Sequence, residues 1–303
     1  MNIFVTGATG YIGGTVAVKL MEAGHRVTGL ARNAERATLL EERGITPVVG
    51  TLDDLDVLAA AAKAADAIAN TANADHPFAA RALAEALEGS AKTLLHTSGT
   101  TIIADNATGE PSDAVFNEDM PRGRLPEKAS RIATDRLVVE TARRGVRAVV
   151  LCPGLVYGAG LGVARHSPQI PAFIATAKAA GIPRHVGRGL NVWSNVHVED
   201  CADAYLAALE HGPAGAFYFL EGGADSMIDV NRAVAQMLGL GEETQAMTLD
   251  EAAREWNVPM AHAMGSNVRV SADKARKVLA WMPSRPAMCD DIVGGSYRDL
   301  QSS

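Results

Sequence analysis

Short apolar runs alternate with segments of helical periodicity along the first half of the chain. The apolar run at residues 3–5 precedes a segment in which Ile12, Val16 and Leu20 share one helical face. The same alternation predicts further strands at residues 26–30, 47–49, 66–69, 93–96 and 147–151, and further helices at residues 34–43, 54–64, 76–89 and 129–144. Strands that alternate with helices are typical of β-α-β units, so we expect an α/β fold with a doubly wound parallel sheet.

The second half of the chain is less regular. Its pattern predicts one strand at residues 216–220 and helices at residues 168–181, 198–211, 229–238, 249–255 and 272–280. We find no internal repeat and no low-complexity linker between the halves. Any second structural unit must therefore be interwoven with the first by several chain crossings.

Composition and charge exclude several classes of protein. A hydrophobic content of 48% in 303 residues is enough for a large core, and a net charge of −7 disfavours nucleic acid as a partner. No apolar run is long and regular enough to cross a membrane. Cys152, Cys201 and Cys289 form no CxxC pair and no metal-ligand spacing. We therefore expect reduced thiols, no metal site and a cytoplasmic location.

The motif that carries the most information is TGATGYIG at residues 6–13, which directly follows the first strand and opens the first helix. Gly7 permits the tight turn, Gly10 allows a pyrophosphate to approach the backbone, and Gly13 allows the helix to pack closely on the sheet. Free amide groups at the start of the helix would hold the anion. The motif in this context predicts a Rossmann-like dinucleotide-binding fold.

The end of the second strand indicates which dinucleotide is bound. An acidic residue there would bind the ribose hydroxyls of NAD, but the chain has Ala31, Arg32 and Asn33 and no acid. The guanidinium of Arg32 would pair with a 2′-phosphate. We therefore expect NADP rather than NAD, the alternative being that Arg32 is only a surface residue at a helix start.

Three later segments extend the pattern: PGLVYG at residues 153–158, NVHVED at 195–200 and LAWMP at 279–283. Together with the glycine loop they resemble the extended short-chain dehydrogenase/reductases, which include the sugar-nucleotide epimerases and dehydratases. The resemblance spans nearly the whole chain. It implies a dinucleotide-binding domain at residues 1–158, completed by residues 190–220, and a mainly substrate-binding region at residues 159–303. It also implies that residues 105–126 form a loop over a small-molecule substrate, and the family often forms homodimers.

The resemblance also implies roles for individual positions. The diphosphate would lie along Gly7, Gly10, Tyr11 and Ile12, and Arg32 would lie beside the adenosine ribose. Thr51 replaces the aspartate with which the family reads adenine, whereas Leu52 would still pack on the ring. The remaining positions would surround the nicotinamide and its ribose: Asn70, Thr71, Ala72, Pro153, Leu155 and Val156.

The chain departs from the family at the catalytic pair. The family reaction uses a Tyr-x-x-x-Lys pair, in which the lysine lowers the tyrosine pKa, but no tyrosine occurs between residues 99 and 156. Alignment through Asp135 puts Glu127 in the tyrosine position and Arg131 in the lysine position. Arg131 would still bind the ribose hydroxyls, but an arginine does not release a proton. The tyrosine-lysine mechanism therefore does not transfer to this chain.

Three hydroxyl groups remain as candidates for chemistry. Ser98 and Thr100 follow the fifth strand, where the family places its catalytic serine or threonine, although both would equally suit a turn over the sheet. Tyr157 follows the predicted nicotinamide border and would reach a substrate, although packing in the core is the alternative. The sequence ranks Ser98 first as the partner of a substrate carbonyl.

Three functions remain open at this stage. The first is an NADPH-dependent oxidoreductase acting on a small carbonyl compound, which the three substrate-side segments favour. The second is a redox-silent NADP sensor, which the missing catalytic pair favours. The third is an epimerase or dehydratase that uses the coenzyme transiently, although the base that such a reaction needs is absent.

Overall fold

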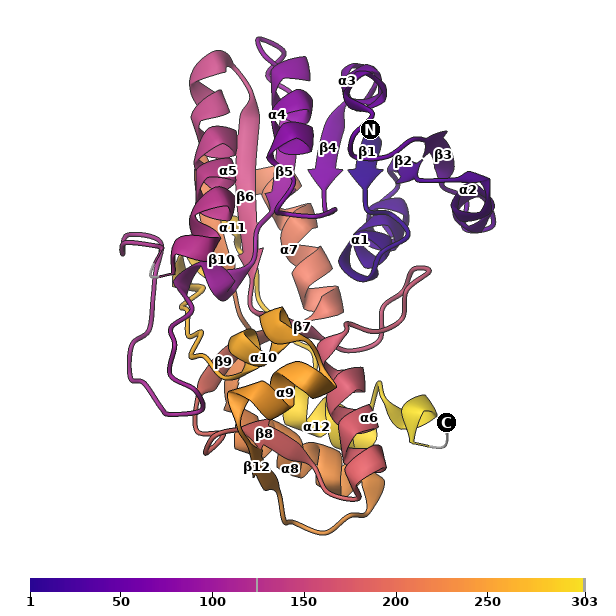
Figure 1. Cartoon of the computed structure of the whole chain (residues 1–303). Helices are drawn as coiled ribbons and strands as arrows, with labels where there is room; N and C mark the ends of the chain where they lie inside the picture. The colour runs from indigo at the N-terminus through magenta and orange to yellow at the C-terminus, as the bar shows by residue number, and fades with distance from the viewer. Residues whose placement is uncertain (124, 302–303) are drawn as a thin grey trace.

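The main sheet of the computed structural model, which describes residues 1–123 and 125–301, has seven strands in the order β10-β6-β5-β4-β1-β2-β3 (Figure 1). All pairings in it are parallel. The strands are β1 (Asn2–Thr6), β2 (Arg26–Ala31), β3 (Thr46–Val49), β4 (Ala67–Asn70), β5 (Thr93–Thr97), β6 (Arg147–Pro153) and β10 (Ala216–Leu220). The chain winds outward from β1 to β3 and then in the opposite direction from β4 to β6. This confirms the predicted doubly wound sheet, whose strand order reverses beside β1, where ligands of such sheets bind.

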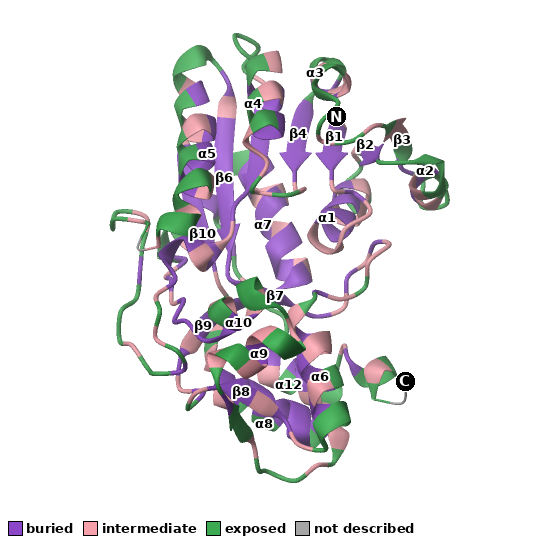
Figure 2. Cartoon of the chain, viewed as in Figure 1, coloured by how far each residue is buried: buried purple, intermediate pink, exposed green. Residues whose placement is uncertain are grey.

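Helices cover both faces of this sheet (Figure 1). On one face lie α3 (Leu55–Ala64), α4 (Pro77–Ala86) and α5 (Ala129–Glu140). On the other lie α1 (Tyr11–Glu22), α2 (Ala34–Glu41), α7 (Val198–His211) and α11 (Asp273–Leu279). The central strands between them are buried, whereas the edge strand β3 is partly exposed, and the outward sides of the helices are exposed (Figure 2). Each helix therefore contributes one apolar stripe to a core on its side of the sheet.

The second part of the chain forms two smaller sheets with helices around them. One has the order β11-β9-β7 and the other pairs β12 with β8. Their strands are β7 (Leu155–Tyr157), β8 (Arg184–Val186), β9 (Val192–His197), β11 (Gly223–Ser226) and β12 (Gln245–Met247). The helices are α6 (Gln169–Ala180), α8 (Met227–Leu238), α9 (Leu249–Glu255), α10 (Val258–Met264) and α12 (Met288–Gly294), with short 3₁₀ turns η1 (Thr100–Ile103), η2 (Pro126–Lys128), η3 (Thr141–Arg144) and η4 (Arg298–Leu300).

The two parts are interwoven. The chain leaves the main sheet after β6, forms β7 to β9, and returns through α7 and β10 before it leaves again. Two of the family-like segments meet at this crossing, because the Trp281 indole donates to the Asp200 carbonyl at 2.8 Å. The Asp200 carboxylate accepts from the amides of Ser284 and Arg285, both at 3.0 Å. The predicted boundary at residue 158 stays a prediction.

The segment that follows η1 is tied along the flank of the molecule. The Asp105 carboxylate accepts from the Asn267 amide at 2.8 Å, and Phe116 forms a bridge with Val270. Glu118 accepts from the Phe219 amide at 2.9 Å. The expected loop over the substrate is thus fixed to both parts of the fold, because its polar side chains cap backbone groups on strands and turns.

Candidate active site

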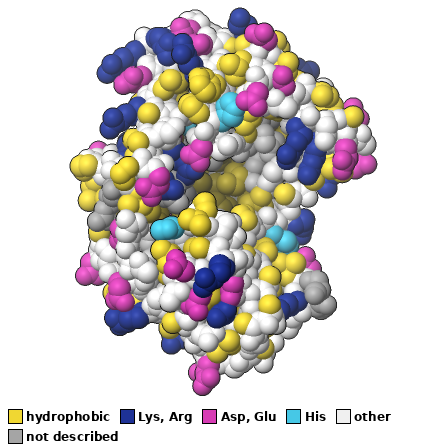
Figure 3. Space-filling model, viewed as in Figure 1, with side chains coloured by type: hydrophobic (Ala, Val, Ile, Leu, Met, Phe, Trp, Pro, Cys, Tyr) yellow, Lys and Arg dark blue, Asp and Glu magenta, His cyan; other side chains and the backbone are white. Residues whose placement is uncertain are grey.

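A cavity of about 250 Å³ lies at the carboxyl ends of the central strands, between the two parts of the fold. Figure 3 shows the hollow in this face, with hydrophobic side chains at its floor. The start of α1, the β5–η1 turn, α5, the β6–β7 connection, β9 and α10 all contribute to its wall. The residues are Tyr11, Ile12, Ser98, Gly99, Thr100, Thr101, Arg131, Pro153, Gly154, Leu155, Val156, Ser167, Pro168, Gln169, Trp193, Ala263 and Met264.

The glycine loop beside this cavity has the close packing that its glycines predict. Gly7 has a φ of +72°, and its carbonyl accepts from the Gly10 amide at 2.8 Å. A Cβ added at Gly13 would lie 2.2 Å from Thr71 Oγ1 and 2.3 Å from the Gly7 carbonyl oxygen. Only a residue without a side chain fits there. The loop therefore brings α1 directly against the end of β4.

The first turn of α1 is open to an anion. Gly10 caps the helix without a side-chain hydrogen bond, and the turn contains no acidic residue. The first amides of a helix have no acceptor within the helix, and the helix dipole favours negative charge at this end. Tyr11 and Ile12, which begin the helix, also line the cavity. These features fit the diphosphate of a dinucleotide.

The structure places the two predicted adenosine contacts at the ends of neighbouring strands. Arg32 directly follows β2 and is exposed, and it makes no hydrogen bond or ion pair with any described residue. Leu52 follows β3 and is partly buried against the core. Thr51 holds the turn at this point through Asp54, whose carboxylate accepts from the Thr51 amide at 2.7 Å.

The three residues predicted to lie under the nicotinamide ribose differ in how deeply they are buried. Asn70 is buried, and its side chain is held between Thr6 and His96 in the core. Thr71 and Ala72 are half-buried beside the glycine loop, where the Thr71 hydroxyl donates to the Thr6 carbonyl at 2.6 Å. Only these two of the three lie near the surface.

Ser98 lines the cavity and is joined to a buried carboxylate. Its hydroxyl donates to Asp135 Oδ2 at 2.7 Å, and both residues are buried. Burial raises the pKa of Asp135 to about 6, against the opposing effect of the Ser98 hydrogen bond. On the other side, His96 Nε2 lies 3.8 Å from Asp135 Oδ1. Burial lowers the pKa of His96 to about 4, so its ring is neutral at neutral pH.

The other two hydroxyl candidates are placed differently from each other. Thr100 lines the cavity at the first position of η1. Tyr157 does not line it, because its phenol donates to the Pro286 carbonyl at 2.6 Å and its ring packs edge-on against His197. Burial holds the pKa of Tyr157 well above its usual range. This position fits the alternative interpretation of Tyr157 as a packing residue. Tyr157 therefore has no part in the mechanism.

Arg131 enters the cavity wall from α5, one turn before Asp135. Its guanidinium pairs with both carboxylate oxygens of Asp75 and donates to Thr101 Oγ1 at 2.9 Å. Glu127 lies in the exposed η2 turn and lines a neighbouring cavity instead. Of the two residues aligned with the missing pair, only Arg131 therefore reaches the candidate site.

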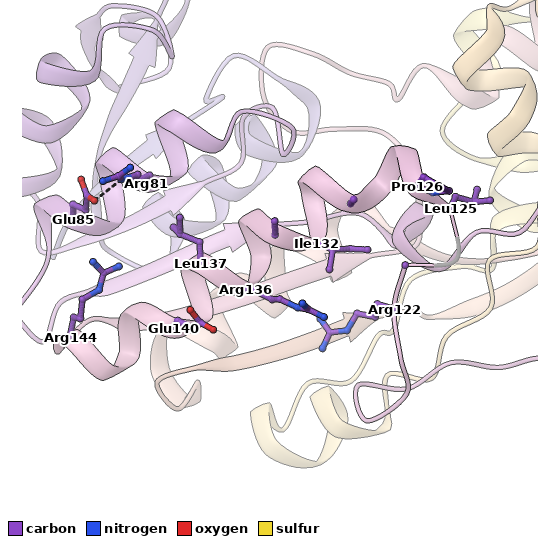
Figure 4. A pocket seen from close by; sticks show the side chains of 13 residues that line it. Arg81, Glu85, Arg122, Leu125, Pro126, Ile132, Arg136, Leu137, Glu140 and Arg144 are labelled. Carbon is purple, nitrogen blue, oxygen red and sulfur yellow. Dashed lines mark hydrogen bonds and ion pairs between the residues drawn. The ribbon is translucent and has the colours of Figure 1, made fainter.

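Other features of the described residues hold no predicted site. A groove of about 710 Å³ beside α4 and α5 contains none of the candidate residues (Figure 4). Among residues 1–123 and 125–301, no group of His, Cys, Asp and Glu side chains has a geometry for a metal ion. No helix in the same ranges is long and apolar enough to span a membrane.

Residues 3–219 match the NAD dependent epimerase/dehydratase family. The chain belongs to this family. An oxidase, ucsJ, from an Acremonium species is 32% identical, covering 96% of this chain and 95% of its own. A 4-hydroxy-2-methyl-3-oxo-4-farnesyl-3,4-dihydroquinoline-1-oxide ketoreductase from Stigmatella aurantiaca is 27% identical. The match covers 93% of this chain and 92% of the ketoreductase. The resemblance stated from the sequence is confirmed, and this member of the epimerase/dehydratase family is an NAD(P)-dependent enzyme of the oxidoreductase type.

A solved structure shows the same fold. The dTDP-glucose 4,6-dehydratase of Bacillus anthracis, in complex with NAD, superposes with a TM-score of 0.77 at 18% identity. The match covers 100% of this chain and 98% of that one. It confirms that the epimerase/dehydratase architecture extends over the whole chain.

Sequence reasoning missed the polar residues behind Ser98. In the sequence, Asp135 was used only to align the helix that carries Glu127 and Arg131. His96 was assigned only to a predicted strand. A signal was present, since Ile132, Asp135 and Val138 recur at spacing three on the buried face of α5. A carboxylate within an apolar stripe needs a partner in the core, and Ser98 is that partner.

Proposed function

We propose that this enzyme is an NADP(H)-dependent reductase of apolar carbonyl compounds. The observation that carries the proposal is the cavity beside the first turn of α1, in which the Ser98 hydroxyl adjoins an apolar wall. When bound, NADPH supplies a hydride. Ser98 would hydrogen-bond the substrate carbonyl oxygen, and Thr100 is the second hydroxyl in reach of the same space. Pro153, Leu155 and Val156 would exclude water from the reacting atoms.

A second cavity supports the choice of substrate class. A space of about 380 Å³ shares Thr101 and Ala263 with the first, and its apolar wall includes Leu125, Val258 and Pro259. A substrate with a carbonyl head in the first cavity and an apolar body in the second would occupy both. The relative from Stigmatella aurantiaca is named for a substrate that carries a farnesyl group.

The charges around the second cavity disfavour a nucleotide sugar. Among the described residues that line it, the one lysine, Lys128, is outnumbered by two carboxylates, Asp105 and Glu127. A nucleoside diphosphate needs a surplus of positive charge or free amide donors. The epimerase alternative therefore has less support from this geometry than the reductase.

The choice of NADP(H) over NAD(H) is part of the proposal. It rests on the exposed guanidinium of Arg32, which pairs with no described residue, and on the absence of an acid at the end of β2. The cytoplasmic location and the homodimer also stay predictions.

The test is coenzyme oxidation by the full-length protein. NADPH or NADH is mixed with benzaldehyde, 2-butanone, 2-undecanone, ethyl acetoacetate or UDP-glucose, and absorbance is followed. We expect NADPH to be consumed, with 2-undecanone reduced at a lower KM than 2-butanone because its tail fills the second cavity. Tight NADPH binding without consumption by any carbonyl would point to the sensor. Conversion of UDP-glucose to UDP-galactose without net coenzyme change would point to the epimerase.

A further inference from the structure

We propose that Asp135 is the proton store of the reaction and that it works through Ser98, which spans the wall between the substrate cavity and a separate cavity behind it. This inference rests on the proposed reductase activity. It assigns to Asp135 and Ser98 the proton transfer for which the chain lacks the family's tyrosine.

The two residues of the relay face different spaces. Ser98 lines the substrate cavity, whereas Asp135 lines a cavity of about 350 Å³ on the other side of the same wall. The single hydrogen bond of 2.7 Å between Ser98 Oγ and Asp135 Oδ2 joins them. Arg122 and Phe217 contribute to the wall of the rear cavity. A proton on Asp135 thus has a cavity large enough for water behind it and a hydroxyl leading to the substrate in front.

A buried chain of hydrogen bonds fixes the orientation of the His96 ring, which faces the Asp135 carboxylate. Thr6 donates to Asn70 Oδ1 at 2.6 Å, so the Asn70 amide nitrogen, 2.9 Å from His96 Nδ1, is the donor to that atom. His96 Nδ1 is therefore an acceptor, and the ring proton sits on Nε2. That N–H faces Asp135 Oδ1. Neither of these two atoms has a hydrogen-bond partner among the described residues, which leaves Oδ2 as the oxygen that exchanges a proton with Ser98.

The surroundings of Asp135 bring its pKa closer to neutral pH. Burial raises its pKa to about 6, the nearby charges of Arg122 and Arg131 lower it, and that of Asp75 raises it. The Cys152 thiol on β6 also faces it, and burial raises the pKa of that thiol so that it stays protonated.

The rear cavity holds the remaining charged groups near Asp135. Besides Arg122 these are Glu118, Arg136, Glu140 and Lys274. Charges of both signs are present there, and burial is the largest influence on the Asp135 pKa.

The proton transfer balances as follows. As the carbonyl carbon gains a hydride, its oxygen takes the proton of Ser98 Oγ, and Ser98 takes the proton of Asp135. Asp135, left as a carboxylate, regains a proton from water in the rear cavity. The net change is carbonyl plus NADPH plus one proton to alcohol plus NADP⁺. In the reverse direction the Asp135 carboxylate accepts the proton through Ser98.

The relay predicts opposite pH profiles for the two directions. The rate of reduction needs protonated Asp135 and should rise as the pH falls through about 6. The rate of alcohol oxidation needs the carboxylate and should rise as the pH increases through the same value. Both profiles are measured with NADPH and 2-undecanone, or NADP⁺ and 2-undecanol. Parallel profiles in the two directions would overturn the relay.

Substitutions test whether Asp135 acts as more than a structural residue. Asp135→Asn keeps the hydrogen-bond acceptor but no exchangeable carboxyl proton. We expect kcat to fall by roughly 100- to 10,000-fold, with KM for NADPH unchanged and the pH dependence lost. Asp135→Glu should restore part of kcat and a pH-dependent profile. Asp291→Asn, which alters a buried carboxylate on α12, is the matched control and should leave kcat and both profiles unchanged.

Two further results separate the possible failures. Ser98→Ala combined with Asp135→Asn should lower kcat no more than Ser98→Ala alone, since the serine change already removes the relay. Infrared difference spectra of a pH titration, recorded without substrate, should show a carboxyl band that titrates near 6 and is lost in Asp135→Asn. If wild type reduces no carbonyl although this band is present, the proposed function fails. If wild type is active and Asp135→Asn keeps its kcat and profile, the relay fails.

Discussion

The guanidinium of Arg131 occupies the space above Gly99: a Cβ built on Gly99 would lie 3.0 Å from Arg131 Nη1. Gly99, which lies between two hydroxyl residues of the cavity, Ser98 and Thr100, therefore makes room for a cation on α5. Asp75 and Thr101 hold the guanidinium there. The positive charge in the cavity wall and the small residue beneath it are parts of one arrangement.

Replacement of Arg131 should weaken coenzyme binding more than folding. Arg131→Met removes charge-assisted donors from the cavity wall, and we expect the Kd for NADPH to rise roughly 10- to 100-fold. Titration calorimetry measures the change. Arg136→Met, on the same helix but facing the outer groove, is the matched control and should bind NADPH as wild type does. Equal affinities in the two variants would contradict the position of Arg131 beside the ribose.

Coenzyme preference should depend on Arg32. Arg32→Asp places a carboxylate where the 2′-phosphate of NADP would lie, so the ratio of NADPH to NADH affinity should fall by at least about tenfold. Arg26→Asp changes an exposed arginine at the opposite end of the same strand and should leave the ratio unchanged. Fluorescence titration with each coenzyme gives both constants. A preference that survives Arg32→Asp would remove this residue from the site.

The close packing at Gly13 predicts a large effect from a single methyl group. In Gly13→Ala the new Cβ would overlap Thr71 Oγ1 and the Gly7 carbonyl, which must move apart. We expect a loss of about 1–3 kcal/mol in the free energy of unfolding and a loss of NADPH binding. Gly222→Ala is the control, since its Cβ would have ordinary contacts from 3.4 Å outward. Wild-type NADPH affinity in Gly13→Ala would show that α1 does not form the diphosphate site.

The buried carboxylate should make stability depend on pH. Burial raises the Asp135 pKa from 3.8 to about 6, so between these values the folded chain binds more protons than the unfolded chain. Its contribution to the free energy of unfolding is thus complete below pH 3.8 and is lost as the pH rises through about 6. Asp135→Asn avoids a buried charge at pH 8, and we expect it to be more stable than wild type there by up to about 3 kcal/mol.

Urea unfolding of wild type and Asp135→Asn at pH 4 and pH 8 measures that difference. The advantage of the variant should be small in acid and larger in base. An advantage of the same size at both pH values would contradict the raised pKa.

Hydrophobic patterning predicted the strands of the main sheet and the helices that cover it, because apolar positions repeat with one regular spacing along each of these segments. The stretches Arg184–Val186 and Gln245–Met247 escaped it. Each has only three residues, and each becomes a strand by pairing with the other across 61 positions of the chain, as Arg184 with Gln245. Local periodicity holds no information about such a partner.

The same limit applies to the candidate site: local motifs in the sequence indicate some of its residues, but contacts between distant segments are not predictable. Gly13 is recognisable because its motif requires glycine at a definite spacing, and Arg131 because alignment through Asp135 puts it in the lysine position of the missing pair. The connection from Ser98 to Asp135 spans 37 positions and exists only once β5 and α5 pack together. A sequence shows a carboxylate on an apolar stripe, but it does not show which hydroxyl will meet it.

The position of β10 has a consequence for synthesis of the chain. Its pairing with β6 closes the outer side of the main sheet, yet residues 216–220 follow β6 by about sixty positions. Until they leave the ribosome, β6 is an unpaired edge with free amide and carbonyl groups, the kind of edge that recruits other chains. A nascent or truncated polypeptide that stops before residue 216 would therefore aggregate or require a chaperone, although it contains the entire glycine loop.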